Sequence, residues 1–577
     1  MANHRFIFAL FQFVLAVVLI PPLAGAIPAS VLRARHLKLP SELRDSYDFI
    51  VIGGGTAGLT IADRLSESSQ SWSHWQGNAS DGSANGFTAH QYNITSKPQT
   101  ELNNKIVSVN VGFCVGGSSA INGMVAIYFV PPDPTLAADF NITYDIQAAW
   151  GQDRDNHLYA SYPGGLDPKF KTYYNALKSV PNIEFPRDGH AGSHGVFWYP
   201  LSVDPKTHMR SYARIAHWDD QERPNYDLIT GCKVNKILLD KHNVATGVQF
   251  VFKVDNTIYT VKASKEVILS AGTMHTPQLL QLSGIGPAGL LKKANIAVKV
   301  DLPGVGSNFQ DHPIGPPVVF NWGQAPPTPP TNSTNMPPSE GQGQGLVAFL
   351  NLPVAAPDAY GTIAARYQSL DLARYVAPDT APAVLAGQRA QQAIFAREMR
   401  AKRVSFLNYV VFPSPMIHPI NFHITSRGTV HINTTAPEAE PVVDYRALTN
   451  PTDIDLMIAY IRFFRRFMAS GPLAQYGPVE ATPGANVSTD AQLASYIRAG
   501  YNPQGWHPVG TAAKMRRELG GVVDDELRVY GVRGLRVADA SIIPTLVAAT
   551  TQLTVYTIAE KIAAMIKETW ERPHGHG

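Results

Sequence analysis

The sequence has little cysteine and little charge. Only two cysteines, Cys114 and Cys232, occur in 577 residues, so no disulfide framework supports the fold. Whether the two pair is left open. Charged residues make up 16% and the formal charge is +3, without a dense basic cluster, which excludes the surface typical of a nucleic-acid-binding protein. Hydrophobic residues reach 45%, enough for a large core and too many for a disordered chain.

Long apolar runs are also scarce. Phe6–Ile20, interrupted only by Gln12, is shorter than the ~20 residues that a membrane span needs, and Ala24-Gly25-Ala26 after it suits signal cleavage. We therefore expect residues 1–26 to be a secretory signal. The protein would then be secreted or held in the secretory pathway (vesicle, vacuole or cell wall), without stable membrane insertion. Six N-x-S/T sequons predict N-glycosylation, at Asn78, Asn93, Asn141, Asn332, Asn433 and Asn486.

The stretch Tyr47–Leu65, YDFIVIGGGTAGLTIADRL, combines a strand, a turn and a helix. Its β-formers Phe49–Ile52 predict a parallel strand buried on both faces. The turn fits G-x-G-x-x-G, in which the first glycine allows a tight turn, the second lets a pyrophosphate approach and the third allows close helix packing. A glycine-rich turn in an unrelated α/β protein is the alternative, but this setting favours dinucleotide binding. The residues concerned are Gly53, Gly55, Thr56, Ala57 and Gly58.

A dinucleotide-binding fold needs a second strand about 20 residues later, ending in an Asp or Glu that holds the ribose hydroxyls. The chain after Leu65 reads SESSQSWSHWQGNASDGSANGFTAHQ, which has the composition of a loop. Neither Glu67 nor Asp81 ends a strand pattern. Either the adenosine is held differently or, as we expect, this strand is missing and the dinucleotide is bound weakly or not at all.

Two later stretches have the form of ligand-binding turns. Gly116-Gly117-Ser118 would let backbone pack against a flat ring or a diphosphate, although a simple Gly-Ser loop is the alternative. The pattern Leu535–Ala538 predicts a strand that ends at Asp539. A carboxylate or N–H group there would face a ligand at the crevice of a parallel sheet.

With these segments the chain resembles the glucose–methanol–choline (GMC) family of flavin oxidoreductases. The resemblance covers most of Tyr47–Lys567, less securely in the middle. It is carried by GGGTAGL, GGSSAINGM, GTMHTPQLLQLSGIG, and HPVGT with the later DASIIP. The signal-like start and the stretch GGVVDDELRVYGV resemble fungal members of the patulin-synthase and versicolorin-B-synthase group.

The resemblance implies an α/β fold with a Rossmann-like FAD-binding domain and an interleaved α+β substrate domain. The residue patterns also predict a second domain inserted between pieces of the first, built on an antiparallel sheet. The expected divisions are 1–26 (signal), 47–135 (FAD-binding, first part), 136–227 (mixed cap region), 228–310 (FAD-binding, second part), 311–500 (substrate domain) and 501–570 (FAD-binding C-terminal part, with the catalytic histidine).

The resemblance also implies FAD as cofactor and no metal. His507, inside Trp506–Thr511, matches the catalytic histidine. Imidazole, with a pKa of about 6.5, can accept the hydroxyl proton of an alcohol substrate while hydride passes to the flavin. Without the motif, a hydrogen-bonded core histidine would be the better interpretation. The implied cofactor contacts, besides the glycine turns, are Asn122, Gly123, Met124, Val125, Val234, Trp506, Asp539, Ala540, Thr551 and Gln552.

Three departures from the family pattern bear on function. The second strand and its carboxylate are expected to be missing, and Val125–Phe140 lacks the usual Arg-Gly segment. Thr550 stands where the family commonly has a second His or Asn, and threonine cannot act as a base near neutral pH. The leading hypothesis is an FAD-dependent oxidase or dehydrogenase acting on a CH–OH group of a small fungal secondary metabolite, for example a mycotoxin precursor. The alternatives are a non-redox dehydrative cyclase with structural FAD, and an inactive family member.

Overall fold

The computed structural model describes residues 36–37, 39–67, 72–75, 91–121, 128–149, 158–162, 166–192, 194–219, 221, 223, 225–331 and 345–571. The predicted signal segment lies outside these residues, as do Asn122, Gly123, Met124 and Val125. None of the helices in this described part combines the length and the hydropathy that crossing a membrane requires.

The main sheet has eight strands in the described part of the chain. The stretch predicted to be a buried strand forms its centre, because Phe49, Ile50 and Val51 in β2 are each 1% exposed or less. Parallel pairing places β2 between β3 and β12. The order is β1 (His36–Leu37), β9 (Tyr226–Ile229), β3 (Trp72–Trp75), β2 (Ser46–Ile52), β12 (Thr257–Leu269), β11 (Ala245–Phe252) and β10 (Cys232–Leu239), with β23 (Leu535–Val537) also beside β12.

The expectation that the second strand is missing is wrong. Trp72–Trp75 forms β3, which runs parallel to both β2 and β9. Backbone pairing with two neighbours outweighs the loop-like composition around it, and tryptophan itself favours strands. Glu67, at the end of α2, forms ion pairs with Arg64 and Lys567. The sequence still has no Asp or Glu directly after β3, so a ribose-binding carboxylate is absent at that position.

The parallel strands of the main sheet end together at one edge. Val267, Ile268 and Leu269 at the end of β12 pair on one side with β2 and on the other with β23. The turns that follow the three strands therefore lie next to one another, which is where α/β sheets bind ligands. These turns begin at Gly53, Ser270 and Ala538.

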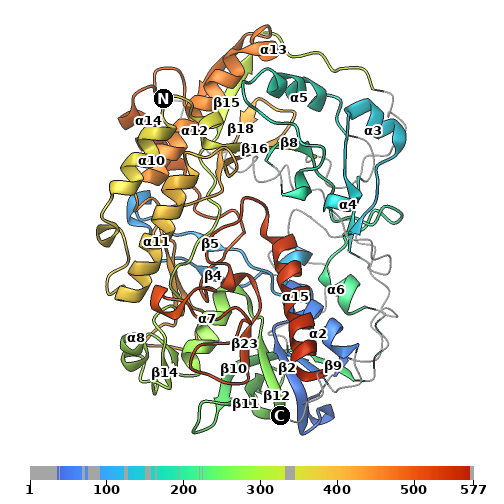
Figure 1. Cartoon of the computed structure of the whole chain (residues 1–577), viewed down its shortest axis with the longest axis vertical. Coiled ribbons are helices and arrows are strands. Elements are labelled where there is room, and N and C mark those ends of the chain that lie inside the picture. Colours follow the sequence, from blue (N-terminus) through green and yellow to red (C-terminus); the bar gives the residue numbers. More distant parts are fainter. Residues whose placement is uncertain are drawn as a thin grey trace, which may run out of the picture.

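Helices from both ends of the chain cover this sheet together. The helix α2 (Thr56–Ser66), directly after the glycine turn, packs along α15 (Thr551–Glu571), and the two lie side by side in the lower half of Figure 1. Arg64 on α2 pairs with Glu560 on α15 at 2.9 Å. The helix α7 (Gly272–Leu282) packs against β10 instead.

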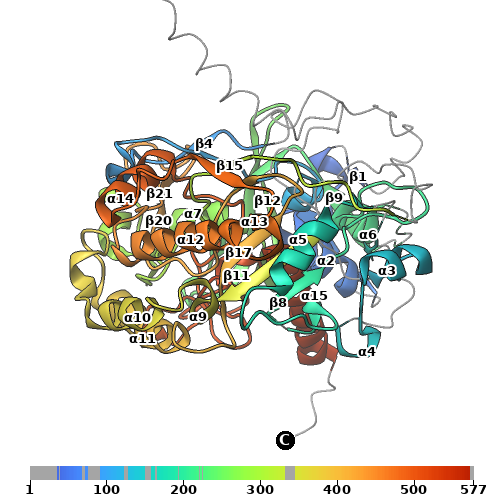
Figure 2. The ribbon, with the colours of Figure 1, turned by 90° about the horizontal axis from the view of Figure 1, so that it is seen from above.

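A second, antiparallel sheet of four strands carries the rest of the core. Its order is β19 (Ile420–Asn421), β17 (Ser405–Val411), β16 (Leu346–Asn351) and β8 (Gly195–Trp198). Aromatic contacts attach helices to this sheet. The ring centroids of Trp198 and Tyr174 are 5.7 Å apart, and those of Tyr409 and Phe464 are 5.0 Å apart. These helices are α5 (Phe170–Lys178), drawn next to β8 in Figure 2, and α12 (Thr452–Ala469), drawn next to β17. The α/β fold with an antiparallel second sheet is therefore confirmed.

Further helices surround this second core, and short strands complete it. The helices are α9 (Leu352–Ala355), α10 (Tyr360–Ser369), α11 (Pro382–Glu398), α13 (Gly471–Ala474) and α14 (Asp490–Gly500). A three-stranded sheet holds β18 (Met416–Ile417), β15 (Val318–Trp322) and β22 (Pro478–Thr482).

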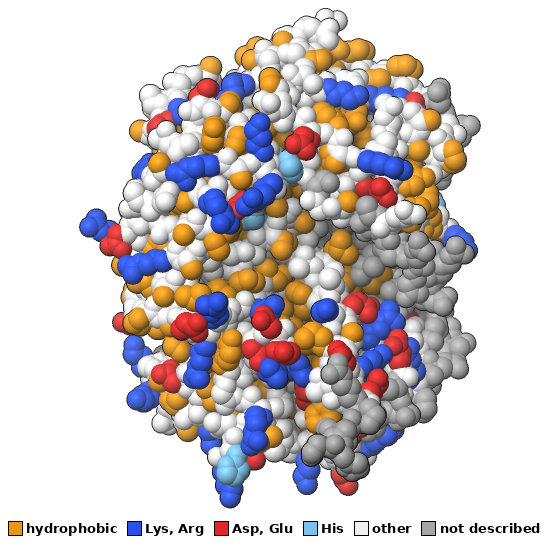
Figure 3. Space-filling model, in the orientation of Figure 1, with side chains coloured by type: hydrophobic (Ala, Val, Ile, Leu, Met, Phe, Trp, Pro, Cys, Tyr) orange, Lys and Arg blue, Asp and Glu red, His pale blue; other side chains and the backbone are white. Residues whose placement is uncertain are grey.

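The surface carries charges of both signs and several predicted glycosylation sites. On the face shown in Figure 3, basic and acidic side chains are interspersed. Asn93, Asn141 and Asn486 are exposed and Asn433 is half-buried. The surface access that a glycan needs is therefore present at the first three, and the modification itself stays a prediction for mass spectrometry.

Candidate active site

A large cavity extends from the C-terminal edge of the main sheet to one face of the second sheet. It is lined by both glycine turns, by loops near the C-terminus and by the second sheet. Most of the predicted site residues that the structure describes line it, namely Gly53, Gly55, Thr56, Ala57, Gly117, Ser118, Val234, Trp506, His507, Asp539, Ala540, Thr550, Thr551 and Gln552. Gly58 and Gly116 are not in this lining.

The first glycine turn leaves space where a pyrophosphate would lie. Gly53 has φ +114°, and a Cβ atom there would stand 2.2 Å from the Ser270 carbonyl oxygen, so only glycine fits. A Cβ atom on Gly55 would meet nothing closer than Gly117 Cα at 3.9 Å. The first helical hydrogen bond runs from Leu59 N to Gly55 O. The preceding N–H groups of α2 therefore remain available to an anion.

The second glycine turn packs directly on the first. Gly116 N donates to Gly54 O at 2.8 Å, and a Cβ atom on Gly117 would stand 2.7 Å from Gly55 Cα. The side chains of the turn serve its own backbone, because Ser118 Oγ accepts from Gly112 N and Ser119 Oγ donates to Gly116 O. Gly116 therefore supports the turn, whereas Gly117 and Ser118 also face the cavity.

The two cysteines do not form a disulfide. Both are free, Cys114 half-buried in the second glycine turn and Cys232 buried on β10. Burial raises the pKa of the Cys114 thiol to about 11, so this thiol is neutral at physiological pH.

Asp539 holds protein groups rather than reaching outward. Its carboxylate accepts from Gly272 N at 2.9 Å, Thr276 Oγ1 at 2.6 Å and Ser541 N at 2.8 Å. It thereby fixes the start of α7 against the end of β23. The pKa of Asp539 is raised by burial, although these hydrogen bonds oppose the shift. Its oxygens are used by these protein donors, whereas the residue and Ala540 line the cavity, so a carboxylate or an N–H group that faces a ligand at this strand end stays a prediction.

His507 lies on a loop that is held by its backbone. Its N–H group donates to Asp311 Oδ1 at 2.8 Å, and Gly505 N donates to the same oxygen at 3.2 Å. Gln310 and Val509 exchange two backbone hydrogen bonds next to this contact. Trp506 has φ +63° and a 53% exposed side chain. The hydrogen bonds to Asp311 hold this loop in place. Trp506 and His507 on the loop both line the cavity.

A second histidine, which the sequence analysis missed, contacts His507. His312 Nδ1 lies 3.0 Å from His507 Nδ1, and His312 Nε2 lies 3.1 Å from the Val547 carbonyl oxygen. His312 is only 1% exposed. The polar pair Asp311-His312 between Phe309 and Pro313 was the available signal.

Burial keeps the histidines of this region neutral. It lowers the pKa of His507 to about 4, and it lowers the pKa of His312 well below the usual 6.5. The pKa of His423, a further unpredicted imidazole in the cavity lining, falls to about 4 for the same reason. Burial raises the pKa of Asp311 to about 7. A neutral imidazole at His507 can accept a proton, as a general base must.

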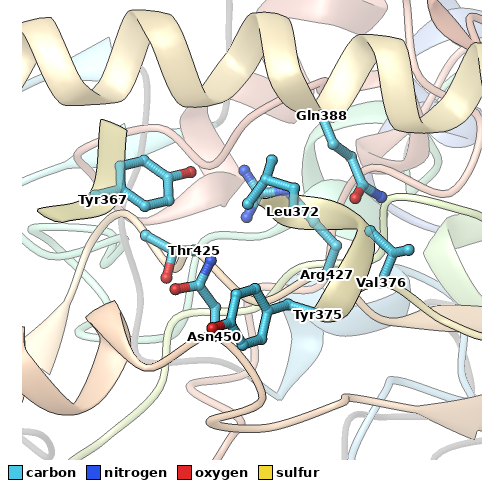
Figure 4. Close-up of a pocket in the computed structure, with 8 residues that line it drawn as sticks. All are labelled: Tyr367, Leu372, Tyr375, Val376, Gln388, Thr425, Arg427 and Asn450. Atoms are coloured by element: carbon cyan, nitrogen blue, oxygen red, sulfur yellow. The ribbon is translucent and has the colours of Figure 1, made fainter. Parts of the chain in front are cut away.

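A separate small cavity has room for about one water molecule. Arg427 points into it (Figure 4) among side chains of the second half of the chain. Its guanidinium is already satisfied, because it donates to Gln391 Oε1 at 2.9 and 3.1 Å and to the carbonyl oxygen of Ser426. This cavity is therefore structural.

Comparison with known proteins identifies the family to which the chain belongs. Models of the GMC oxidoreductase family match residues 181–314 and 425–559. The chain is 33% identical to a dehydrogenase, xptC, of Emericella nidulans, over 94% of this chain and 96% of that protein.

Two solved structures are also similar. A Chaetomium thermophilum FAD-dependent oxidoreductase has a TM-score of 0.85 at 32% identity, covering 91% of this chain and 100% of that one. A fungal aryl-alcohol oxidase has a TM-score of 0.84 at 30% identity, covering 92% and 100%. The patulin-synthase and versicolorin-B-synthase subgroup is not confirmed. The chain belongs to the GMC oxidoreductase family, whose cofactor is FAD.

Proposed function

We propose that the protein is an FAD-dependent oxidase or dehydrogenase that oxidises the CH–OH group of an alcohol or lactol in a small, apolar metabolite. The observation that carries this proposal is a neutral imidazole, His507, in the lining of the same cavity as two packed glycine turns. The similarity to a fungal dehydrogenase and to an aryl-alcohol oxidase supports it.

The described residues fit the cofactor. The open space at Gly55 and the N-terminus of α2 would hold the diphosphate. Val234 on β10 lies in the cavity lining where the adenine would be bound, and Thr551 and Gln552 at the start of α15 would contact the flavin ring. Bound FAD supplies the hydride acceptor for the reaction.

His507 would take the proton of the substrate hydroxyl. Partial removal from water disfavours the charged form of this half-buried imidazole and lowers its pKa, so it is unprotonated before substrate binds. Thr550, in the same lining, could donate or accept a hydrogen bond with the hydroxyl but could not remove its proton. His507 is therefore the base in the proposed reaction.

The second sheet gives the substrate part of the cavity an apolar wall. Phe197 and Phe349 meet edge to face at 5.1 Å, and they line the cavity with aliphatic neighbours from the same sheet. Burial of apolar surface favours an aromatic or otherwise apolar substrate over a sugar. The wall also includes Tyr199, Leu201, Val203, Val347 and Val410.

Anaerobic mixing of the holoenzyme with alcohols tests the proposal. We expect benzylic, allylic or lactol alcohols to bleach the flavin absorbance, and glucose to do so far more slowly. Stopped-flow absorbance measures the rate for each compound. If no alcohol in such a panel reduces the flavin, the proposed oxidation is wrong.

Thr550 favours a second candidate, a dehydrative cyclase in which FAD is structural. The usual second His or Asn is absent there, so a pair of redox side chains is incomplete. In that reaction His507 would act as acid or base on the ring-closing hydroxyl, and substrate would never bleach the flavin. The third alternative, an inactive member, loses its main argument because β3 is present.

The pH dependence of oxidation should reflect the lowered pKa of His507. His507 acts when unprotonated, and a lowered pKa keeps it unprotonated at lower pH. We therefore expect the acid limb of kcat/KM to have its midpoint near pH 4, where burial places the pKa of His507 at about 4, rather than near the ordinary value of about 6.5. Initial rates between pH 3.5 and 9 measure it. A midpoint of 6.5 or above would contradict the assignment.

A further inference from the structure

We propose that His312 is a positioning residue that fixes the tautomer of His507, with the proton on Nδ1 and the lone pair on Nε2. His507 would then present Nε2 as the base to the substrate. The kinetic part of this inference rests on the proposed function, whereas the tautomer itself does not.

The argument starts from the Val547 carbonyl oxygen, which can only accept a hydrogen bond. Because it lies 3.1 Å from His312 Nε2, that nitrogen must carry a proton. A neutral imidazole has one N–H group and one lone pair. The lone pair of His312 is therefore on Nδ1.

The tautomer of His507 follows from the next contact. His312 Nδ1 and His507 Nδ1 are 3.0 Å apart, a normal hydrogen-bond distance. Since His312 Nδ1 is the acceptor, His507 Nδ1 must be the donor. The opposite tautomer would turn two lone pairs toward each other in a part-buried contact, without a hydrogen bond to compensate.

Both rings are held so that this contact persists. Asp311 binds the backbone N–H groups of Gly505 and His507, and a Cβ atom on Gly505 would stand 2.5 Å from the His312 carbonyl oxygen. The His312 ring packs against Phe422 with centroids 5.2 Å apart. The geometry therefore depends on packing as well as on the hydrogen bond.

The electrostatics of the region keep His312 neutral, so that its Nδ1 atom can accept a hydrogen bond from His507. A protonated imidazole has two donors and no acceptor, so His312 must be neutral. Burial lowers its pKa well below 6.5, and nearby His507 and His423 lower it further. Asp311 lies beside the pair, and its Oδ1 atom accepts hydrogen bonds from the two backbone N–H groups of the loop rather than from either imidazole ring.

Two variants of His312 separate positioning from packing. His312→Asn offers an amide oxygen near the position of Nδ1, whereas His312→Leu has a similar volume and no acceptor. A small misplacement of a catalytic group can cost up to about 100-fold in rate. We expect His312→Leu to slow flavin reduction by about that factor at unchanged FAD content, and His312→Asn to recover most of the rate.

The decisive readout is the tautomer itself, measured by ¹⁵N–¹H correlation spectra of full-length holoenzyme labelled at histidine. The His507 signals are assigned by their loss in His507→Ala. We expect the Nδ1–H form in wild type and in His312→Asn, and the Nε2–H form or a mixture in His312→Leu. The inference is overturned by an Nε2–H form in wild type, or by a His312→Leu enzyme with unchanged rate and tautomer.

These outcomes also distinguish this inference from the proposed function. If no alcohol bleaches the wild-type flavin, the proposed oxidation fails, while the spectra still decide the tautomer. If His312→Leu does not fold, the wild-type spectrum and the His312→Asn variant decide it.

Discussion

Replacing His507 with alanine is expected to slow the reduction of bound flavin by about 10³–10⁴-fold. Removal of a positioned base usually costs about 10²–10⁴ in rate, and neither Thr550 nor His312 can take over the role of His507. Thr550 cannot take a proton near neutral pH, and His312 already uses both ring nitrogens, on Val547 and on His507. The loss should therefore lie toward the upper end. Anaerobic stopped-flow absorbance with the best alcohol measures it.

The FAD content of His507→Ala should equal that of wild type, because His507 is not part of the glycine turns. Thr550→Ala is the matched control, since it also shortens a side chain in the cavity lining but removes no base. We expect the rate of flavin reduction in that control to fall by less than about tenfold, which corresponds to the loss of one hydrogen bond. Fast bleaching that survives His507→Ala would remove His507 from the mechanism.

Replacing Gly55 with valine is expected to abolish FAD binding while leaving the fold intact. The backbone at Gly55, with φ −90°, is allowed for any residue, and the nearest atom to a Cβ would be 3.9 Å away. The protein therefore tolerates the side chain, which would instead occupy the place of the pyrophosphate. Valine is a poorer N-cap for α2 than glycine, and this change should lower the free energy of unfolding by only about 1 kcal/mol. The ratio of flavin to protein absorbance after purification measures the binding.

Gly361→Val is the control for this substitution. Gly361 is exposed on α10, and no atom lies within 4 Å of a Cβ placed there, so FAD content should not change. Thermal unfolding of the flavin-free proteins shows whether Gly55→Val is folded. A Gly55→Val protein that purifies with a full complement of flavin would show that the turn has only a structural role.

Local patterns in the sequence were sufficient where a segment's own residues decide its structure. The apolar run Phe49–Ile52 and the glycines after it predict the strand, turn and helix that the structure contains. The same approach failed for Trp72–Trp75, because that strand owes its form to parallel pairing on both sides. Propensity cannot report hydrogen bonds to strands that are distant in sequence.

In the site, too, local motifs could be predicted from the sequence and long-range contacts could not. His507 is found through its motif, but its contact with His312 joins positions 195 residues apart, which no local pattern reveals. Asp539 shows the opposite limit. Its place at the end of a strand was predicted, yet two of the partners of its carboxylate, Gly272 and Thr276, come from α7, which only the folded structure brings to it.

The pairing of α2 with α15 has a consequence for how the protein is made. The first glycine turn leaves the ribosome early, but Thr551 and Gln552, which line the same cavity, come from the last helix. The strand β23, which completes the edge beside β12, is also made late. The cofactor site therefore cannot be completed until β23 and α15 have been synthesised. Until then the main sheet of the nascent chain lacks a strand beside β12. Such an exposed edge is a typical point of aggregation, and truncation even of the final helix would remove one wall of the site.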